Sequence, residues 1–215
     1  TAEMRGKLRV REDENVLVLD RASLRMLDED WLSSGVFTIS IGDSAIIFND
    51  LQLHSRIGAV YFEGELRRFG NNFDGCLRFE RIDMSALNHN KFLPMPVEGT
   101  AAGIIRSSGD LNDPDLVISV NLLNGSIDDI PVERFSLKTS YSGNYCRLDT
   151  LSLSSPAGFA FASGDIENIN LDELLHWGTE SLVETQSSLE IYCGDLSVEP
   201  FIDYFPGIPF SEGTF

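Results

Sequence analysis

A pattern of sixteen residues occurs twice in this chain, one hundred positions apart. Residues 51–66 read LQLHSRIGAVYFEGEL, and residues 151–166 read LSLSSPAGFAFASGDI. Five positions are identical, although only about one identity is expected from average residue usage. A shorter echo follows each copy, as PVEGT at 96–100 and PFSEGT at 209–214. A long repeat of short strands favours a β-structure that grows by adding strands, and it disfavours a compact catalytic domain.

The repeat also sets the expected domain organisation. We expect residues 1–215 to form one repetitive array without separate domains, with repeat halves at about 45–100 and 145–214. No stretch rich in Pro, Ser and Gly divides the chain. The sequence opens on Thr1 and stops one residue after the second Glu-Gly-Thr echo, so we interpret it as a fragment of a longer polypeptide.

Alternation of apolar and polar residues with a period of two dominates the chain. The clearest alternating runs lie at 7–11, 37–41, 73–79, 116–122, 135–139, 151–153, 159–161 and 189–193. Turns are predicted at Asp-Gly 74–75, Asn-Asp-Pro-Asp 112–115, Asn-Gly 124–125 and Ser-Gly-Asn 142–144. Short helices are predicted at 82–87, capped by Asp83 or Ser85, and at 170–177. The pattern predicts an all-β fold, an elongated curved sheet of stacked strands with one or two short helices.

Two glycines occupy the same place in both copies of the repeat. Gly64 and Gly164 lie inside strand patterns, where glycine usually marks a bulge or a sharp bend. A bend that recurs in successive strands would curve the whole sheet into a trough or groove.

One side of nearly every predicted strand is apolar and the other is polar. An alternating antiparallel sheet buries one face and exposes the other to water, so the apolar face must meet another sheet, curl on itself or hold a ligand. The residues that we expect to line this apolar strip are Leu51, Leu53, Val60, Phe62, Leu77, Phe79, Ile104, Leu116, Ile118, Val120, Phe135, Leu137, Leu151, Leu153, Phe159, Phe161, Leu189 and Ile191. The same residues could form the dry core of a β-sandwich or of a closed β-helix.

The charge of the chain excludes several kinds of partner. Acidic residues outnumber basic ones by 34 to 16, which gives a net charge of −18. Such a charge repels nucleic acid and anionic lipid surfaces, so we expect neither a nucleic acid partner nor a peripheral membrane role. No run of 18 apolar residues is present that could span a bilayer.

The patterns that usually carry catalysis or metal binding are missing. The sequence has no GxSxG, Walker or GxGxxG motif, and His54, His89 and His176 lack the spacing of metal ligands. The run 110–115 has neither the glycine nor the later glutamate of a calcium loop, so we expect a turn there. The cysteines are too few and scattered for a disulfide framework, and are expected as small apolar side chains: Cys76, Cys146 and Cys193. We therefore expect no catalytic residue, no metal and no cofactor.

The order of several motifs resembles the AsmA-like family of envelope proteins, in particular translocation and assembly module B (TamB). The first stretch is WLSSGVFTISIG at 31–42, followed by IIFNDLQL at 46–53 and the glycine-spaced strand that ends at Leu66. The second stretch is FDGCLRF at 73–79, MSAL at 84–87 and LPMPVEGT at 93–100. The third is residues 99–164, with GDLNDP at 109–114, Asn124-Gly125, Ile130-Pro131 and Tyr141.

The resemblance implies a rolled β-sheet, U-shaped in section, whose apolar concave surface conducts phospholipids between the inner and outer membranes. It implies a periplasmic location, with phospholipid acyl chains as partners. It also implies an inner-membrane anchor and an outer-membrane assembly barrel as partners of the full-length protein, which is linked to outer-membrane protein assembly. The residues alone leave two other classes open: a non-catalytic structural or adhesive β-solenoid and, less favoured, a polysaccharide-active β-helix.

Overall fold

The computed structural model describes residues 2–10, 14–26, 28–88, 96–128, 130–168 and 186–194 of the chain. Most of them belong to one antiparallel sheet of thirteen strands. The strands are β1 (Ala2–Val10), β2 (Glu14–Met26), β3 (Glu29–Ser33), β4 (Phe37–Gly42), β5 (Ala45–Ser55), β6 (Gly58–Arg67), β7 (Asn72–Asp83), β8 (Val97–Asp110), β9 (Asp113–Ile127), β10 (Ile130–Ser142), β11 (Tyr145–Ser155), β12 (Gly158–Glu167) and β13 (Gln186–Gly194). The described residues include one helix, α1 (Ser85–Asn88). The predicted all-β fold is confirmed.

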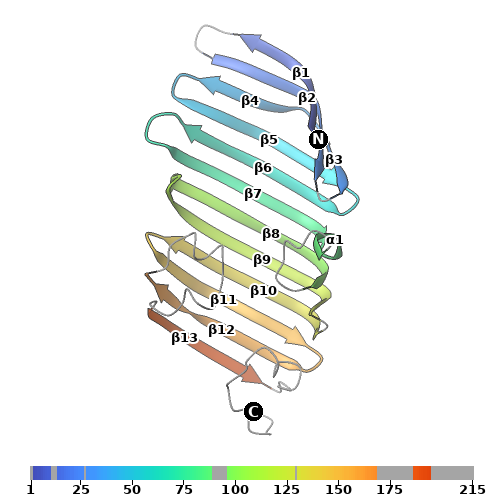
Figure 1. Cartoon of the computed structure of the whole chain (residues 1–215), viewed down its shortest axis with the longest axis vertical. Helices are drawn as coiled ribbons and strands as arrows, with labels where there is room; N and C mark the ends of the chain where they lie inside the picture. Colours follow the sequence, from blue (N-terminus) through green and yellow to red (C-terminus); the bar gives the residue numbers. More distant parts are fainter. Residues whose placement is uncertain are drawn as a thin grey trace.

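Successive strands are neighbours in the sheet, in nearly the order of the sequence (Figure 1). The exception is the position between β2 and β5, which β3 and β4 share. β4 pairs with the first half of β2 and β3 with its second half, and both pair with β5. The sheet is therefore a meander of hairpins, which differs from a parallel β-helix.

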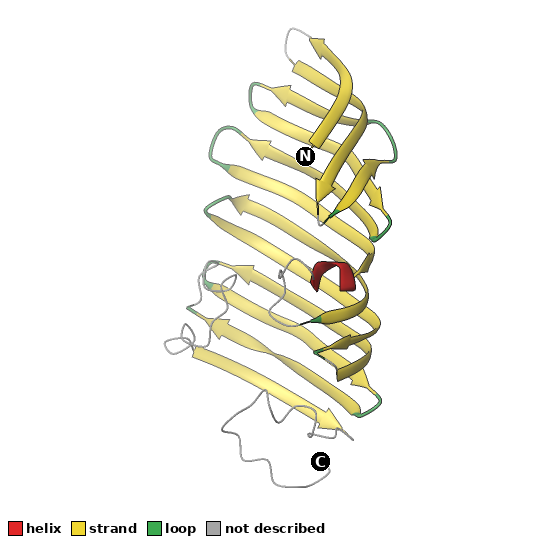
Figure 2. Ribbon diagram, turned by 45° about the vertical axis from the view of Figure 1, so that its right-hand side comes forward, coloured by secondary structure: helices red, strands yellow, loops and turns green. Residues whose placement is uncertain are grey.

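The sheet is long and curved. Its strands cross the long axis obliquely and stack from β1 at one end to β13 at the other (Figure 1). One long side of the sheet, where strands end and where β3 and α1 lie, curls over, and we call it the curled edge. α1 lies on the inner side of the curve (Figure 2).

The sequence repeat corresponds to a repeated hairpin. The first copy forms β5 and β6, and the second forms β11 and β12. Both hairpins close with a Ser–Gly pair around a two-residue turn, Ser55 with Gly58 and Ser155 with Gly158. Each serine Oγ accepts a hydrogen bond from the backbone N–H two residues later, at 3.2 and 3.1 Å. Both glycines have positive φ, 148° and 126°, which explains why the turn requires glycine.

A bulge also recurs in both copies. The register shifts between Phe48 and Leu51 in β5, and between Leu148 and Leu151 in β11. In each case the bulge lies beside the glycine that both copies share, so the predicted irregularity is present but its extra residues are in the facing strand. Because of the bulge, Phe48 and Leu51 face the same side of the sheet although they are three positions apart.

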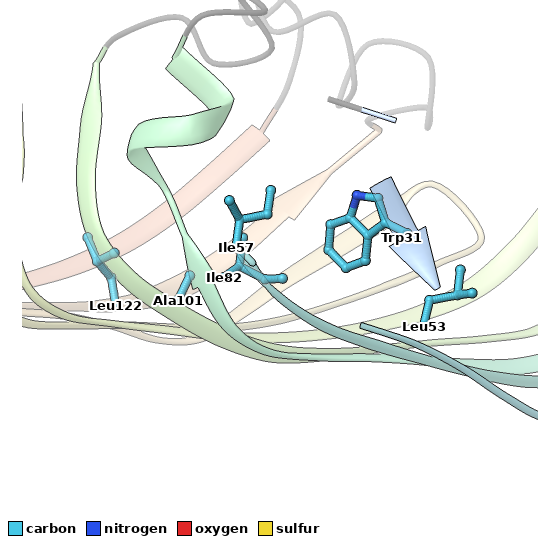
Figure 3. Close-up of a cluster of buried hydrophobic side chains, with 6 residues drawn as sticks. All are labelled: Trp31, Leu53, Ile57, Ile82, Ala101 and Leu122. Atoms are coloured by element: carbon cyan, nitrogen blue, oxygen red, sulfur yellow. The ribbon is translucent and has the colours of Figure 1, made fainter. Parts of the chain in front are cut away.

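The buried core lies along the curled edge. Figure 3 shows its six side chains, Trp31, Leu53, Ile57, Ile82, Ala101 and Leu122. They come from β3, β5, the β5–β6 turn, β7, β8 and β9. Trp31 and Ile57 are each only 1% exposed, so this edge of the sheet is closed by its own side chains.

The helix predicted at 82–87 is confirmed as the single turn α1. The Asp83 carboxylate accepts a hydrogen bond from the backbone N–H of Ser85 at 3.1 Å, so Asp83 caps it. The side chains at and before α1 that pack against the core are Met84, Ala86 and Leu87.

Two predicted turns are wrong, because Asp74-Gly75 lies inside β7 and Asn124-Gly125 inside β9. A Cβ atom on Gly125 would lie 1.9 Å from the carbonyl oxygen of Glu98, so this glycine permits a close approach of two strands. The other two predicted turns correspond to the connections before β9 and before β11. The helix predicted at 170–177 and the echo at 209–214 lie outside the described residues.

Candidate functional site: the apolar face of the sheet

One face of the sheet carries rows of mostly apolar side chains, interrupted by glycines and by Thr139 and Ser107, and we call it the apolar face. Residues that oppose each other in neighbouring strands lie on the same face, so each row can be followed through the register. One row contains Leu53, Val60, Phe79, Gly103, Val120, Leu137, Leu151, Ala162 and Ile191. The next row contains Leu51, Phe62, Leu77, Ile105, Ile118, Thr139, Leu148, Gly164 and Leu189.

Two further rows flank these. Toward the curled edge the row contains Ile82, Ala101, Leu122, Phe135, Leu153, Ala160 and Cys193. Toward the other edge it contains Phe48, Gly64, Gly75, Ser107, Leu116, Tyr141, Cys146 and Ile166. The apolar face therefore extends from β5 to β13 and is four rows wide from β7 to β12.

The structure places all but three of the predicted lining residues together on this face. Those on the apolar face are Leu51, Leu53, Val60, Phe62, Leu77, Phe79, Leu116, Ile118, Val120, Phe135, Leu137, Leu151, Leu153, Leu189 and Ile191.

Ile104 is the first exception. Its register partners are Arg78 and Ser119, so it lies on the opposite face, which we call the polar face. Ile105 takes the position on the apolar face, opposite Leu77. The two adjacent isoleucines obscure the alternation, but Arg106 lies two positions after Ile104 and so faces the same side. This charged neighbour is the signal that assigns Ile104 to the polar face.

Phe159 and Phe161 are the other exceptions. They oppose Ser154 and Ser152 on the polar face and are 41% and 39% exposed. The neighbouring positions of their strand on the apolar face are occupied by alanines, Ala160 and Ala162. The prediction selected the two large side chains of this strand, but its alanines are the residues that lie on the apolar face.

The apolar face is only partly covered. Most of its residues between β5 and β12 are half-buried, whereas Leu53, at the curled edge, is 8% exposed. At the far end of the sheet, Leu189 and Ile191 are 50% and 69% exposed. The described residues form one sheet and provide no second sheet opposite this face. The described residues therefore do not form the closed core of a β-sandwich.

Aromatic rings fill the places where this face lacks side chains. The ring of Phe62 lies 5.8 Å from that of Phe48 and stacks at 6.5 Å on that of Phe73, between centroids. A Cβ atom on Gly75 would lie 2.3 Å from the Phe73 ring, so the ring lies directly over this glycine. These rings therefore form an uncharged part of the apolar face.

The polar face carries charged side chains together with many hydroxyl groups. The guanidinium of Arg78 lies 4.3 Å from the centre of the Tyr61 ring, a cation–π contact. A hydrogen bond with Glu65 raises the pKa of Arg67, and the hydrogen bond that Tyr145 donates to Asp165 raises the pKa of Tyr145. These groups are at the surface, where ion pairs add little stability.

The described residues contain no metal-binding cluster and no disulfide. Within them, no group of three or more His, Cys, Asp or Glu side chains could hold a metal ion, and all three cysteines are free thiols. Asp110 accepts hydrogen bonds from the backbone and side-chain nitrogens of Asn112 at 2.8 and 2.9 Å, which confirms the predicted turn. None of the helices in the described residues is long and apolar enough to cross a membrane. His89 and His176 lie outside those residues.

Comparison of the chain with protein-family models, with curated proteins and with solved structures gives no match. The resemblance to the AsmA-like family therefore stays a prediction.

Proposed function

We propose that the apolar face binds the hydrocarbon chains of lipids, and that the chain is a segment of an envelope bridge that conducts phospholipids between two membranes. In this proposal the segment lies in the periplasm. The full-length protein would be anchored in the inner membrane, engage an outer-membrane assembly barrel and contribute to outer-membrane protein assembly, as the resemblance to TamB implies.

One observation supports the proposal above all. Adjacent rows of mostly apolar residues run across β5 to β13, four of them side by side from β7 to β12. Most of these residues remain partly exposed because the described chain supplies no second layer. Soluble proteins rarely expose a contiguous apolar surface of this extent unless it binds something. A surface that is long, apolar and only partly covered suits a long, apolar ligand.

The energetics also suit an acyl chain. Each methylene removed from water contributes about 0.8 kcal/mol, so about ten methylenes contribute about 8 kcal/mol before the cost of ordering the chain. Hydrophobic contacts have no preferred direction. A hydrocarbon chain can therefore move from one row to the next without losing a specific bond, and no reacting group is required.

Ile118 is the best position for a test. It lies near the middle of the apolar face, in β9, between Ile105 in β8 and Thr139 in β10. Ile118→Asp places a carboxylate where the lipid would lie, and binding would then require that charge to lose its water. We expect the amount of bound phospholipid, counted by native mass spectrometry after purification without detergent, to fall at least about tenfold.

Ser119→Asp is the matched control. It introduces the same charge one residue later on the same strand, but on the polar face, where Ser119 opposes Ile104 and Lys138. We expect this variant to keep its lipid and to give the same circular dichroism spectrum as the original chain. If neither the original chain nor Ser119→Asp carries lipid, or if Ile118→Asp retains as much lipid as Ser119→Asp, the apolar face is a scaffold surface and the proposal is wrong.

A further inference from the structure

The last described strand, β13, exposes large apolar side chains on both of its faces. Leu189 and Ile191 are 50% and 69% exposed on the apolar face, and Tyr192 is 64% exposed on the polar face, next to Phe159 and Phe161 of β12. Interior strands do not share this property, because neighbours on both sides cover them. β13 therefore carries the large apolar side chains that are typical of an interior strand, although it lies at the end of the described sheet.

The backbone of β13 is also paired on one side only. Among the described strands, β13 pairs with β12 alone, so its other edge presents N–H and C=O groups without a strand partner in the described part of the chain. Proteins usually protect such an edge with charges, proline or a bulge, because it is a template for another strand. The nine residues of β13, QSSLEIYCG, include no proline and one charge.

We propose that the free edge of β13 binds β13 of a second copy of this chain, in antiparallel orientation. A twofold axis perpendicular to the sheet would relate the two copies, so each would present the same surface to the other. The two sheets would then join edge to edge.

The sequence of β13 is self-complementary about Ile191. With the axis at this residue, Ile191 opposes Ile191 of the second copy, Leu189 opposes Cys193, and Glu190 opposes Tyr192. Opposed residues share a face, so apolar residues meet apolar ones on the apolar face. Moving the axis to Glu190 would place two carboxylates opposite each other, which is unfavourable. The axis at Ile191 avoids that repulsion.

The consequence is an apolar face that continues without interruption from one copy into the other. The inference does not depend on lipid binding, because self-association is measured without lipid. Since one strand edge is a small interface, we expect a weak dimer that dissociates on dilution.

Sedimentation equilibrium in reducing buffer without detergent tests the dimer. The average mass should rise with concentration from that of one chain, 23.9 kDa, toward twice that value. Ile191→Lys places two like charges at the axis and should weaken dimerisation by more than about tenfold. Val117→Lys is the matched control, because Val117 is also exposed, at 38%, but lies in the interior strand β9. It should leave dimerisation unchanged.

A cysteine cross-link tests the register. Directly opposed residues of antiparallel strands have Cα atoms about 4.5–5.5 Å apart, within the range of a disulfide. In a background with Cys76→Ser and Cys193→Ser, Ile191→Cys should form a disulfide-linked dimer under mild oxidation. Glu190→Cys should link at least about tenfold more slowly, because its counterpart would be diagonal, roughly 7–8 Å away.

Three results would overturn the inference. They are a monomer at every concentration, equal dimerisation of Ile191→Lys and the original chain, and equal cross-linking at positions 190 and 191. A monomer would mean that another part of this chain covers the edge or that the edge needs no cover. Loss of the dimer with lipid still bound would separate this failure from failure of the proposed function.

Discussion

Replacing Trp31 by alanine should destabilise the curled edge more than any other single truncation we consider. Trp31 belongs to the short strand β3, is 1% exposed and packs within the core cluster that includes Leu53 and Ile57. Its indole N–H donates a hydrogen bond to the carbonyl oxygen of Met26 at 3.2 Å. The side chain therefore ties β3 to both the end of β2 and the sheet beneath it.

The size of the effect follows from the buried area. A buried tryptophan removes about 200 Å² from water, and at about 25 cal/mol per Å² this contributes about 5 kcal/mol. The alanine retains a small part of that area, and the lost hydrogen bond adds about 1 kcal/mol. Because β3 is short and can move inward to fill part of the space, we expect Trp31→Ala to lower the free energy of unfolding by about 3–5 kcal/mol.

Urea denaturation followed by far-ultraviolet circular dichroism measures this difference. Leu32→Ala is the matched control, because Leu32 is the next residue in β3 but is 43% exposed, so its truncation should cost less than about 1 kcal/mol. Equal transition midpoints for the two variants, or a loss below about 1 kcal/mol for Trp31→Ala, would refute the view that this tryptophan holds the curled edge closed.

Two further predictions concern glycine packing and pH. Gly103→Ala should lower the free energy of unfolding by about 1–3 kcal/mol, because the new Cβ atom would lie 2.5 Å from the Phe79 ring. Gly35→Ala is the control: a Cβ atom there has nothing within 4 Å, so it should change the free energy of unfolding by less than about 0.5 kcal/mol. Equal losses for the two variants in urea denaturation would contradict the packing argument. The hydrogen bond to Asp165 raises the pKa of Tyr145, so it favours the folded state below the unfolded pKa of about 10 and this contribution disappears as the pH rises through the raised folded pKa. Asp165→Asn should therefore let Tyr145 ionise at lower pH in a spectrophotometric titration of the tyrosines, and an unchanged curve would contradict the assignment.

The fold was predictable because two independent patterns in the sequence agree. Alternation with a period of two specifies strands, and the repeat specifies that they form similar hairpins. The serine and glycine that close each hairpin occur at the same places in both copies, Ser55 with Gly58 and Ser155 with Gly158. The width of the sheet and the position shared by β3 and β4 were not predictable, because they depend on contacts between residues that lie far apart in the sequence.

The wrong turn predictions share one physical cause. Asp-Gly and Asn-Gly pairs are strong turn signals, but glycine also serves where a ring or another backbone comes close. Gly75 lies under the Phe73 ring, and Gly125 faces the backbone of Glu98. The sequence does not reveal that these neighbours are present, so local preference and tertiary packing lead to different answers.

The error at Phe159 and Phe161 could have been avoided by using the repeat. Phe161 occupies the same place in the second copy as Tyr61 in the first, and Tyr61 lies on the polar face. Phe159 corresponds in the same way to Ala59, which opposes His54 and Glu80 rather than a residue of the apolar rows. Equivalent residues of the two copies face the same side of the sheet, so the repeat assigns both phenylalanines to the polar face.

The same equivalence shows how one module can provide a strip of varying depth. Val60 and Phe62 of the first hairpin correspond to Ala160 and Ala162 of the second, and all four lie on the apolar face. Smaller side chains on the same backbone leave the strip less filled over β12 than over β6. Because the repeat fixes the backbone while the side chains on one face differ, the depth of the strip can change along the sheet without a change of fold.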